Sequence, residues 1–128
     1  MSEDRKKILI ADDEPNIVTA LEFLLKREGY EVLIARGGDE ALKLVEAEQP
    51  DLVLLDVMMP MRSGFEVCRR IRSRVDARRI KIVILTAKGR EAEMEKGLGA
   101  GADLYITKPF SNAKLVAAVS GLLEMPAR

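Results

Sequence analysis

Short apolar runs alternate along this chain with segments whose apolar residues recur at helical spacing. The runs cover residues 7–11, 31–35, 52–55, 80–85 and 104–107, and we expect each to be a strand. Residues 52–55 are apolar throughout, and residues 80–85 are apolar apart from one lysine. Such runs are typical of strands that are buried on both faces of a sheet.

The segments between the runs have the periodicity of amphipathic helices. We expect helices over residues 16–28, 39–48, 65–74 and 90–98, and a last helix that follows Ser111 and ends near residue 124. The helix over 90–98 gives the weakest signal, because each glycine near its end costs about 1 kcal/mol where it is helical. Ser111 is placed to cap the last helix.

This alternation predicts an α/β fold, in which a doubly wound, five-stranded parallel sheet is covered by helices on both faces. The pattern runs through the whole chain of 128 residues. We therefore expect a single domain over residues 1–128 and no separate output domain.

The composition excludes several kinds of site. The chain has no histidine and a single cysteine, Cys68. A Ser-His-Asp triad, a histidine-ligated metal and an intramolecular disulfide are therefore excluded. No apolar run approaches a membrane span, and the N-terminus lacks a secretory signal. We expect a cytoplasmic protein without a membrane contact.

The charge is unevenly distributed along the chain. The formal net charge is zero, but residues 1–68 carry −7 and residues 69–128 carry +7. Seven of the basic residues fall within 69–81, where no aromatic residue or helix-turn-helix pattern accompanies them. We interpret this stretch as a solvated surface and not as a nucleic-acid site.

Polar side chains follow four of the five expected strands. They are Asp12 and Asp13 after the first strand, Asp56 after the third, Thr86 after the fourth and Lys108 after the fifth. In an open α/β sheet the carboxyl ends of the strands meet at one edge, where ligands bind. We therefore expect three carboxylates, a hydroxyl and an ammonium to converge there.

Three neighbouring carboxylates repel one another, and a hard divalent cation such as Mg²⁺ removes that cost. Asp56 can then attack a phosphoryl group as a nucleophile, while Lys108 and Thr86 hold the phosphoryl oxygens. Each residue alone also has a purely structural interpretation: Asp13 can be a helix cap, Thr86 a turn residue and Lys108 a surface charge. Their joint position favours phosphoryl transfer.

Residues 8–14, 51–60, 85–87 and 101–110 resemble the response-regulator receiver domains of two-component signalling, including chemotaxis regulators. The resemblance covers essentially the entire chain. It implies a flavodoxin-like three-layer sandwich with the strand order 2-1-3-4-5. It also implies that Asp56 is the phosphoacceptor and that Asp12, Asp13 and Asp56 hold Mg²⁺, with the backbone carbonyl of Met58 as a further ligand.

The resemblance further implies that Thr86 and Lys108 contact the phosphoryl group. Tyr105 corresponds to an aromatic switch residue that turns inward when the Thr86 hydroxyl moves toward the phosphoryl group, and the bond before Pro109 corresponds to a cis peptide. The loop after Pro60 departs from the family, since Arg62 replaces an apolar residue. Ser63 can still cap the third helix.

The function implied is that of a phosphoacceptor in a phosphorelay. A sensor histidine kinase or a histidine phosphotransfer protein supplies the phosphoryl group, a downstream protein responds to the phosphorylated form, and hydrolysis resets the chain. The family also suggests a homodimer through the fourth helix, fifth strand and last helix. Phe23, which lies off the apolar arc of the first helix, is a candidate docking residue. We do not expect an enzyme that turns over an external metabolite.

Three alternatives remain. A Mg²⁺-dependent phosphatase with an aspartate nucleophile needs a second acid two residues further on, where Met58 stands. A flavin-binding module needs a hydroxyl- and glycine-rich loop after the first strand, which here reads Asp12-Asp13-Glu14. The third alternative is a binding scaffold that is not phosphorylated, and the complete set of site residues argues against it.

Overall fold

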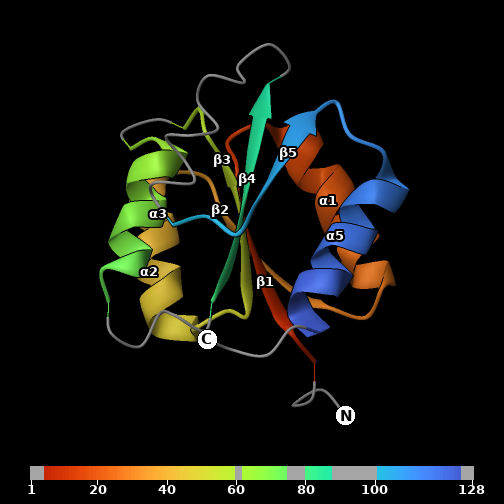
Figure 1. Cartoon of the computed structure of the whole chain (residues 1–128), viewed down its shortest axis with the longest axis horizontal. Coiled ribbons are helices and arrows are strands. Elements are labelled where there is room, and N and C mark those ends of the chain that lie inside the picture. Colours follow the sequence, from red (N-terminus) through yellow and green to blue (C-terminus); the bar gives the residue numbers. More distant parts are fainter. Residues whose placement is uncertain (1–4, 60–61, 75–79, 88–100, 125–128) are drawn as a thin grey trace.

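The computed structural model describes residues 5–59, 62–74, 80–87 and 101–124 (Figure 1). The helix expected over residues 90–98 lies outside these ranges. The described strands are β1 (Lys7–Ala11), β2 (Glu31–Ala35), β3 (Leu52–Asp56), β4 (Lys81–Ala87) and β5 (Leu104–Lys108). The described helices are α1 (Pro15–Arg27), α2 (Gly38–Glu48), α3 (Gly64–Arg72) and α5 (Asn112–Glu124).

All five strands are parallel and lie in the order β2-β1-β3-β4-β5, which confirms the expected fold. Helices α1 and α5 cover one face of the sheet, and α2 and α3 cover the other (Figure 1). None of the described helices is long and apolar enough to cross a membrane.

Alternation along each strand builds two cores, one on either face of the sheet. Ile8 and Ile10 of β1 pack toward α1 and α5, whereas Leu9 and Ala11 pack toward α2 and α3. All four side chains are fully buried. Because both faces are covered, the strands read as continuous apolar runs and not as an alternating pattern.

Two serine caps fix the starts of helices, as the sequence indicates. The Ser63 hydroxyl accepts a hydrogen bond from the Glu66 N–H at 3.2 Å, and the Ser111 hydroxyl accepts one from the Lys114 N–H at 3.0 Å. Asp13 does not cap α1, because the residue before that helix is Glu14 and its side chain makes no cap hydrogen bond.

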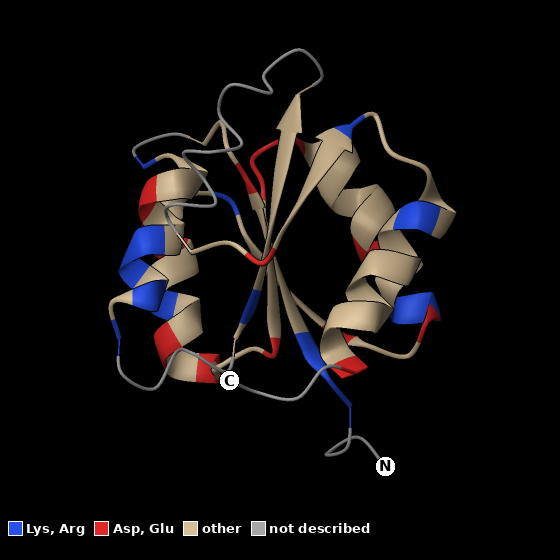
Figure 2. Cartoon of the chain, in the orientation of Figure 1, with Lys and Arg blue, Asp and Glu red and all other residues tan. Residues whose placement is uncertain are grey.

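Ion pairs join α3 to its neighbours. Arg62 pairs with Asp39 of α2 and with Glu66 of α3, so this departure from the family pattern fastens the loop before α3 to both helices. Arg74 pairs with Glu46 of α2 at 3.0 Å. The cations that flank α3 on either side are therefore matched by carboxylates of α2 and α3, which carry the acidic residues seen in Figure 2.

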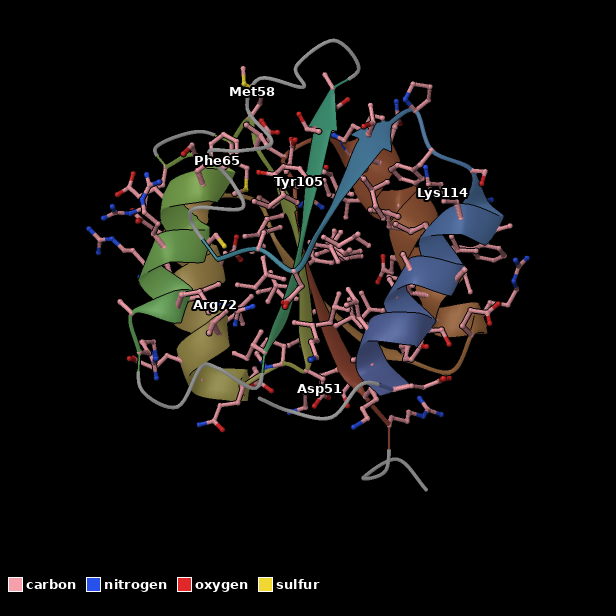
Figure 3. The ribbon with its side chains drawn as sticks, viewed as in Figure 1. Asp51, Met58, Phe65, Arg72, Tyr105 and Lys114 are labelled. Carbon is pink, nitrogen blue, oxygen red and sulfur yellow. The ribbon has the colours of Figure 1, made fainter. Side chains whose placement is uncertain are left out.

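Arg72 ties the end of α3 to the amino end of the sheet (Figure 3). Its guanidinium donates hydrogen bonds to the Gly101 carbonyl at 2.8 Å, the Ile80 carbonyl at 2.6 Å and the Asp103 carboxylate at 2.6 Å. Asp103 also accepts a hydrogen bond from the Ile82 N–H at 2.8 Å. This buried carboxylate thus has both a cation and a backbone donor.

Candidate functional site

The strands that carry the candidate site residues end side by side at one edge of the sheet (Figure 1). Asp12 directly follows β1, Asp56 is the last residue of β3, and Lys108 is the last residue of β5. Thr86 lies within β4, which runs to Ala87. The expected bounds of β1 and β2 are confirmed, whereas β3, β4 and β5 extend one or two residues beyond their expected carboxyl ends, because the sheet pairing continues past the apolar runs.

Three carboxylates gather at this edge. Oxygen atoms of Asp12, Asp13 and Asp56 all lie within 4.8 Å of one another. Asp12 and Asp56 are buried, whereas Asp13 is exposed. The turn after β1 holds Asp12 in place, since its N–H donates to the Ala35 carbonyl and its carboxylate accepts from the Glu14 N–H at 2.9 Å.

Lys108 places its ammonium among these carboxylates. The Nζ atom lies 3.3 Å from Oδ2 of Asp12 and 3.4 Å from Oδ1 of Asp56. Burial alone would lower the pKa of Lys108, but the charges of Asp56 and Asp12 outweigh it and raise the pKa above its ordinary value. The ammonium is therefore charged at neutral pH.

The environment of Asp56 opposes its ionisation. Burial raises the pKa of this carboxyl to about 6, and the nearby Asp12 adds to the rise. The Lys108 ammonium and the Met58 N–H, 3.4 Å from Oδ1, act in the opposite direction without cancelling it. A negative charge on Asp56 is thus costly in the protein without a metal ion.

The donor set fits a hard divalent cation. Its atoms are carboxylate oxygens, two of the three carboxylates are buried, and the nearby ammonium offsets the repulsion only in part. Mg²⁺ takes oxygen ligands and is commonly held by one or two carboxylates together with water and phosphate oxygens. The arrangement suits this ion better than zinc, whose structural sites favour Cys and His.

Thr86 brings a hydroxyl to the same edge. It is buried, and its Oγ1 has no hydrogen-bond partner among the residues that the structure describes. Such a buried donor is available for a ligand oxygen.

Tyr105 lies on the same face of the sheet as Thr86. It pairs in register with Ile84 and packs partly buried against the core under α2 and α3 (Figure 3). Since side chains alternate along a strand, Ile84 and Thr86 point to this same face. The coupled movement of Thr86 and Tyr105 stays a prediction.

The loop after β3 closes tightly against Asp56. The Gly64 N–H donates to the Val57 carbonyl at 3.0 Å, and a Cβ atom on Gly64 would lie only 2.4 Å from the Asp56 carbonyl oxygen. Glycine is therefore required at this close approach. The Met58 side chain points outward beside the site and is exposed (Figure 3).

A cleft of about 320 Å³ opens onto these groups, with Asp13, Asp56, Met58 and Lys108 among its walls. Glu14 also lines it, although the residue pattern alone assigned no role to this side chain. The sequence feature that could have identified Glu14 is its position between the acidic pair and Pro15. The Lys108–Pro109 peptide bond beside the cleft is cis, as the family resemblance implies.

Comparison with known proteins gives a consistent result. Residues 8–120 match the model of the response regulator receiver domain. A structure described as a putative response regulator of Chloroflexus aurantiacus is 34% identical, with a TM-score of 0.92, over 95% of this chain and 100% of that one.

Two further solved structures show the range of similar proteins. The receiver domain of a sensor histidine kinase of Pseudomonas aeruginosa, with a magnesium ion coordinated in its active-site cleft, is 30% identical with a TM-score of 0.87. The match covers 94% of this chain and 99% of that one. The chemotaxis protein CheY4 of Vibrio cholerae is 29% identical with a TM-score of 0.86, over 92% of this chain and 98% of that one.

Proposed function

The chain belongs to the family of response regulator receiver domains, and from this premise we propose that it accepts a phosphoryl group on Asp56. The observation that carries the proposal is the Lys108 ammonium, which lies 3.4 Å from Asp56 at the edge of an acidic cluster. A nucleophile, a cation and a metal-binding donor set thus meet in one cleft.

The chemical step is an attack of a carboxylate oxygen on phosphorus. An Asp56 oxygen forms a new bond to phosphorus while the bond from phosphorus to the donor's imidazole nitrogen breaks. The electron pair of that bond stays on the nitrogen, which takes up a proton. In this proposal Lys108 donates hydrogen bonds to the phosphoryl oxygens, as does the Thr86 hydroxyl, which has no partner within the described part of the chain.

The carboxylates of Asp12, Asp13 and Asp56 and the backbone carbonyl of Met58 would hold Mg²⁺. When bound, the ion supplies positive charge that offsets the carboxylate repulsion and the charge of the phosphoryl group. The similar Pseudomonas receiver holds this ion in its own active-site cleft.

The proposed cycle ends in hydrolysis of the acyl phosphate. Before that, Thr86 moves toward the phosphoryl group, Tyr105 turns inward, and the altered surface acts on a downstream protein. A sensor histidine kinase or a histidine phosphotransfer protein supplies the phosphoryl group, in the cytoplasm. We do not propose an enzyme that acts on external metabolites, because Met58 stands where a phosphatase of this kind needs a proton donor.

The test uses acetyl phosphate with Mg²⁺ and intact-mass measurement. The wild type and a Glu28→Gln control, which changes an exposed carboxylate at the far end of α1, should gain one phosphoryl group. Asp56→Ala should gain none, and EDTA should abolish the gain in the wild type. A phosphoryl adduct on Asp56→Ala would overturn the assignment, and repeated turnover of para-nitrophenyl phosphate would favour the phosphatase.

We also propose that the phosphorylated chain forms a homodimer through β5 and α5, together with the helix that the sequence predicts over residues 90–98. Small residues occupy the exposed side of α5 at Ala113, Ala117 and Gly121, where a second copy can approach closely. Sedimentation with and without beryllofluoride, a mimic of the phosphoryl group, measures this directly. A monomer in both states at high concentration contradicts it.

A further inference from the structure

Glu14 is a fourth carboxylate at the site, next to the acidic cluster in sequence. It precedes α1, where an acidic side chain commonly satisfies the free N–H groups of the first turn. The Glu14 side chain makes no such hydrogen bond. Its Oε1 atom lies instead 3.3 Å from Nζ of Lys108.

Three carboxylates therefore share one ammonium. The distances from Lys108 Nζ are 3.3 Å to Asp12, 3.3 Å to Glu14 and 3.4 Å to Asp56. All three exceed the 2.7–2.9 Å or so of a strong charge-assisted hydrogen bond. The Lys108 ammonium is shared among the three carboxylates, and its interaction with Glu14 weakens its interaction with Asp56.

The balance of charge at the site distinguishes Glu14 from the other three carboxylates. If the proposed function holds, a divalent cation and the Lys108 ammonium together match the three negative charges of Asp12, Asp13 and Asp56. Among the residues that the structure describes, Glu14 then adds one negative charge beyond those that these cations match. Its side chain is 60% exposed and lines the same cleft as Asp56, so its charge acts on a phosphodonor that enters this cleft.

We propose that Glu14 is a specificity-determining residue, which selects phosphodonors by their charge and holds Lys108 back until a phosphoryl group arrives. The inference rests on the proposed phosphorylation of Asp56. A doubly negative donor such as acetyl phosphate is repelled more strongly than a singly negative one such as phosphoramidate. Phosphoramidate carries its phosphorus on a nitrogen that can be protonated, as phosphohistidine does, so the selection favours a protein-bound histidine donor.

The test compares the wild type with Glu14→Gln, which keeps the shape and removes the charge. Coulomb's law in water, for charges about 6 Å apart, gives roughly a threefold change in rate for each negative charge on the donor. At saturating Mg²⁺, acetyl phosphate should react about ninefold faster with the variant and phosphoramidate about threefold faster. The ratio of the two rate constants should then change about threefold, and less at high salt.

A second readout needs no phosphodonor. Mg²⁺ binding, measured by calorimetry, should weaken in Glu14→Gln, because a negative charge is lost and Lys108 turns further toward Asp12 and Asp56. Weaker metal binding with faster phosphorylation is a combination that general damage to the site does not produce. Glu14→Asp, which retains the charge, should keep the wild-type ratio of donors.

Glu28→Gln is the matched control, because it removes the same charge at the other end of α1, and it should change neither the donor ratio nor Mg²⁺ binding. Glu14→Ser, which restores a good cap residue, repeats the measurement if Glu14→Gln is unstable. An unchanged donor ratio, or a parallel fall in both rates and in metal affinity, would overturn the role of Glu14. Failure of the wild type to gain a phosphoryl group on Asp56 would instead overturn the proposed function.

Discussion

Replacing Asp56 by asparagine should make the metal-free protein more stable, even though it removes the proposed phosphoacceptor. Asp56 is buried beside Asp12, and its pKa is raised from an ordinary value of 3.8 to about 6. Above pH 6 the folded protein therefore contains an unfavourable negative charge. Asparagine keeps the shape of the side chain and removes that charge.

The rise in pKa sets the size and the sign of the effect. About 1.4 kcal/mol for each unit of pKa gives roughly 3 kcal/mol as an upper limit, and we expect about 1–3 kcal/mol. The folded protein holds the proton on Asp56 more tightly than the unfolded chain does. The contribution of Asp56 to stability thus falls as the pH rises from 3.8 to about 6 and stays at its lowest above that range. The advantage of asparagine should be full near neutral pH and should vanish toward pH 4 or so.

Urea unfolding followed by circular dichroism, in EDTA at about pH 7.5 and again at about pH 5, measures this difference. Asp103→Asn is the matched control, because the Asp103 side chain is also buried, at 8% exposed, but pairs with Arg72 at 2.6 Å. This substitution removes a paired charge and should destabilise the protein by about 3 kcal/mol. The same chemical change should thus have opposite effects at the two positions.

A loss of stability in Asp56→Asn near pH 7.5 would refute the reasoning, and so would a gain that does not change with pH. Addition of Mg²⁺ provides a further check, since a ligand that binds only the folded state stabilises it. Mg²⁺ should stabilise the wild type more than Asp56→Asn and should therefore reduce the difference between them.

Three further substitutions test the surroundings of the site. Gly64→Ala should destabilise the protein by about 1–3 kcal/mol in urea unfolding and should slow phosphorylation, because the added methyl group meets the Asp56 carbonyl. Ser63→Ala should cost about 1 kcal/mol in the same assay, since it removes the hydroxyl that accepts from the Glu66 N–H. Phe23→Ala should leave stability unchanged, because its side chain is 67% exposed. It should slow phosphoryl transfer from a phosphotransfer protein but not from acetyl phosphate, and equal rates from the protein donor would exclude it as a docking residue.

The pattern of apolar residues predicted the layers of the fold because burial on both faces leaves few polar residues within the strands. It misplaced the strand ends, since Asp56, Thr86 and Lys108 belong to the sheet but are polar. The tendency of site residues to follow parallel strands was enough to predict that these side chains meet at one edge.

Contacts between distant positions were harder to predict. Glu14 and Lys108 are 94 residues apart, and no local pattern links them. Arg62 likewise looks out of place in the loop after β3 until the structure shows Asp39 and Glu66 on either side of it. Both pairings depend on how α1, α2 and β5 are brought together by the completed sheet.

β5 lies at one edge of the described sheet, and this position affects how the site can lose its function. Among the strands that the structure describes, β5 is hydrogen-bonded to β4 alone, whereas β1 and β3, which bear the acidic cluster, each have two neighbours. A local opening that frees β5 breaks a single ladder, and it carries Lys108 away while the three carboxylates stay together. Such an opened form would still bind a cation and would be unable to trap the phosphoryl group. We therefore expect fraying of β5 to abolish phosphorylation of Asp56 before the whole domain unfolds.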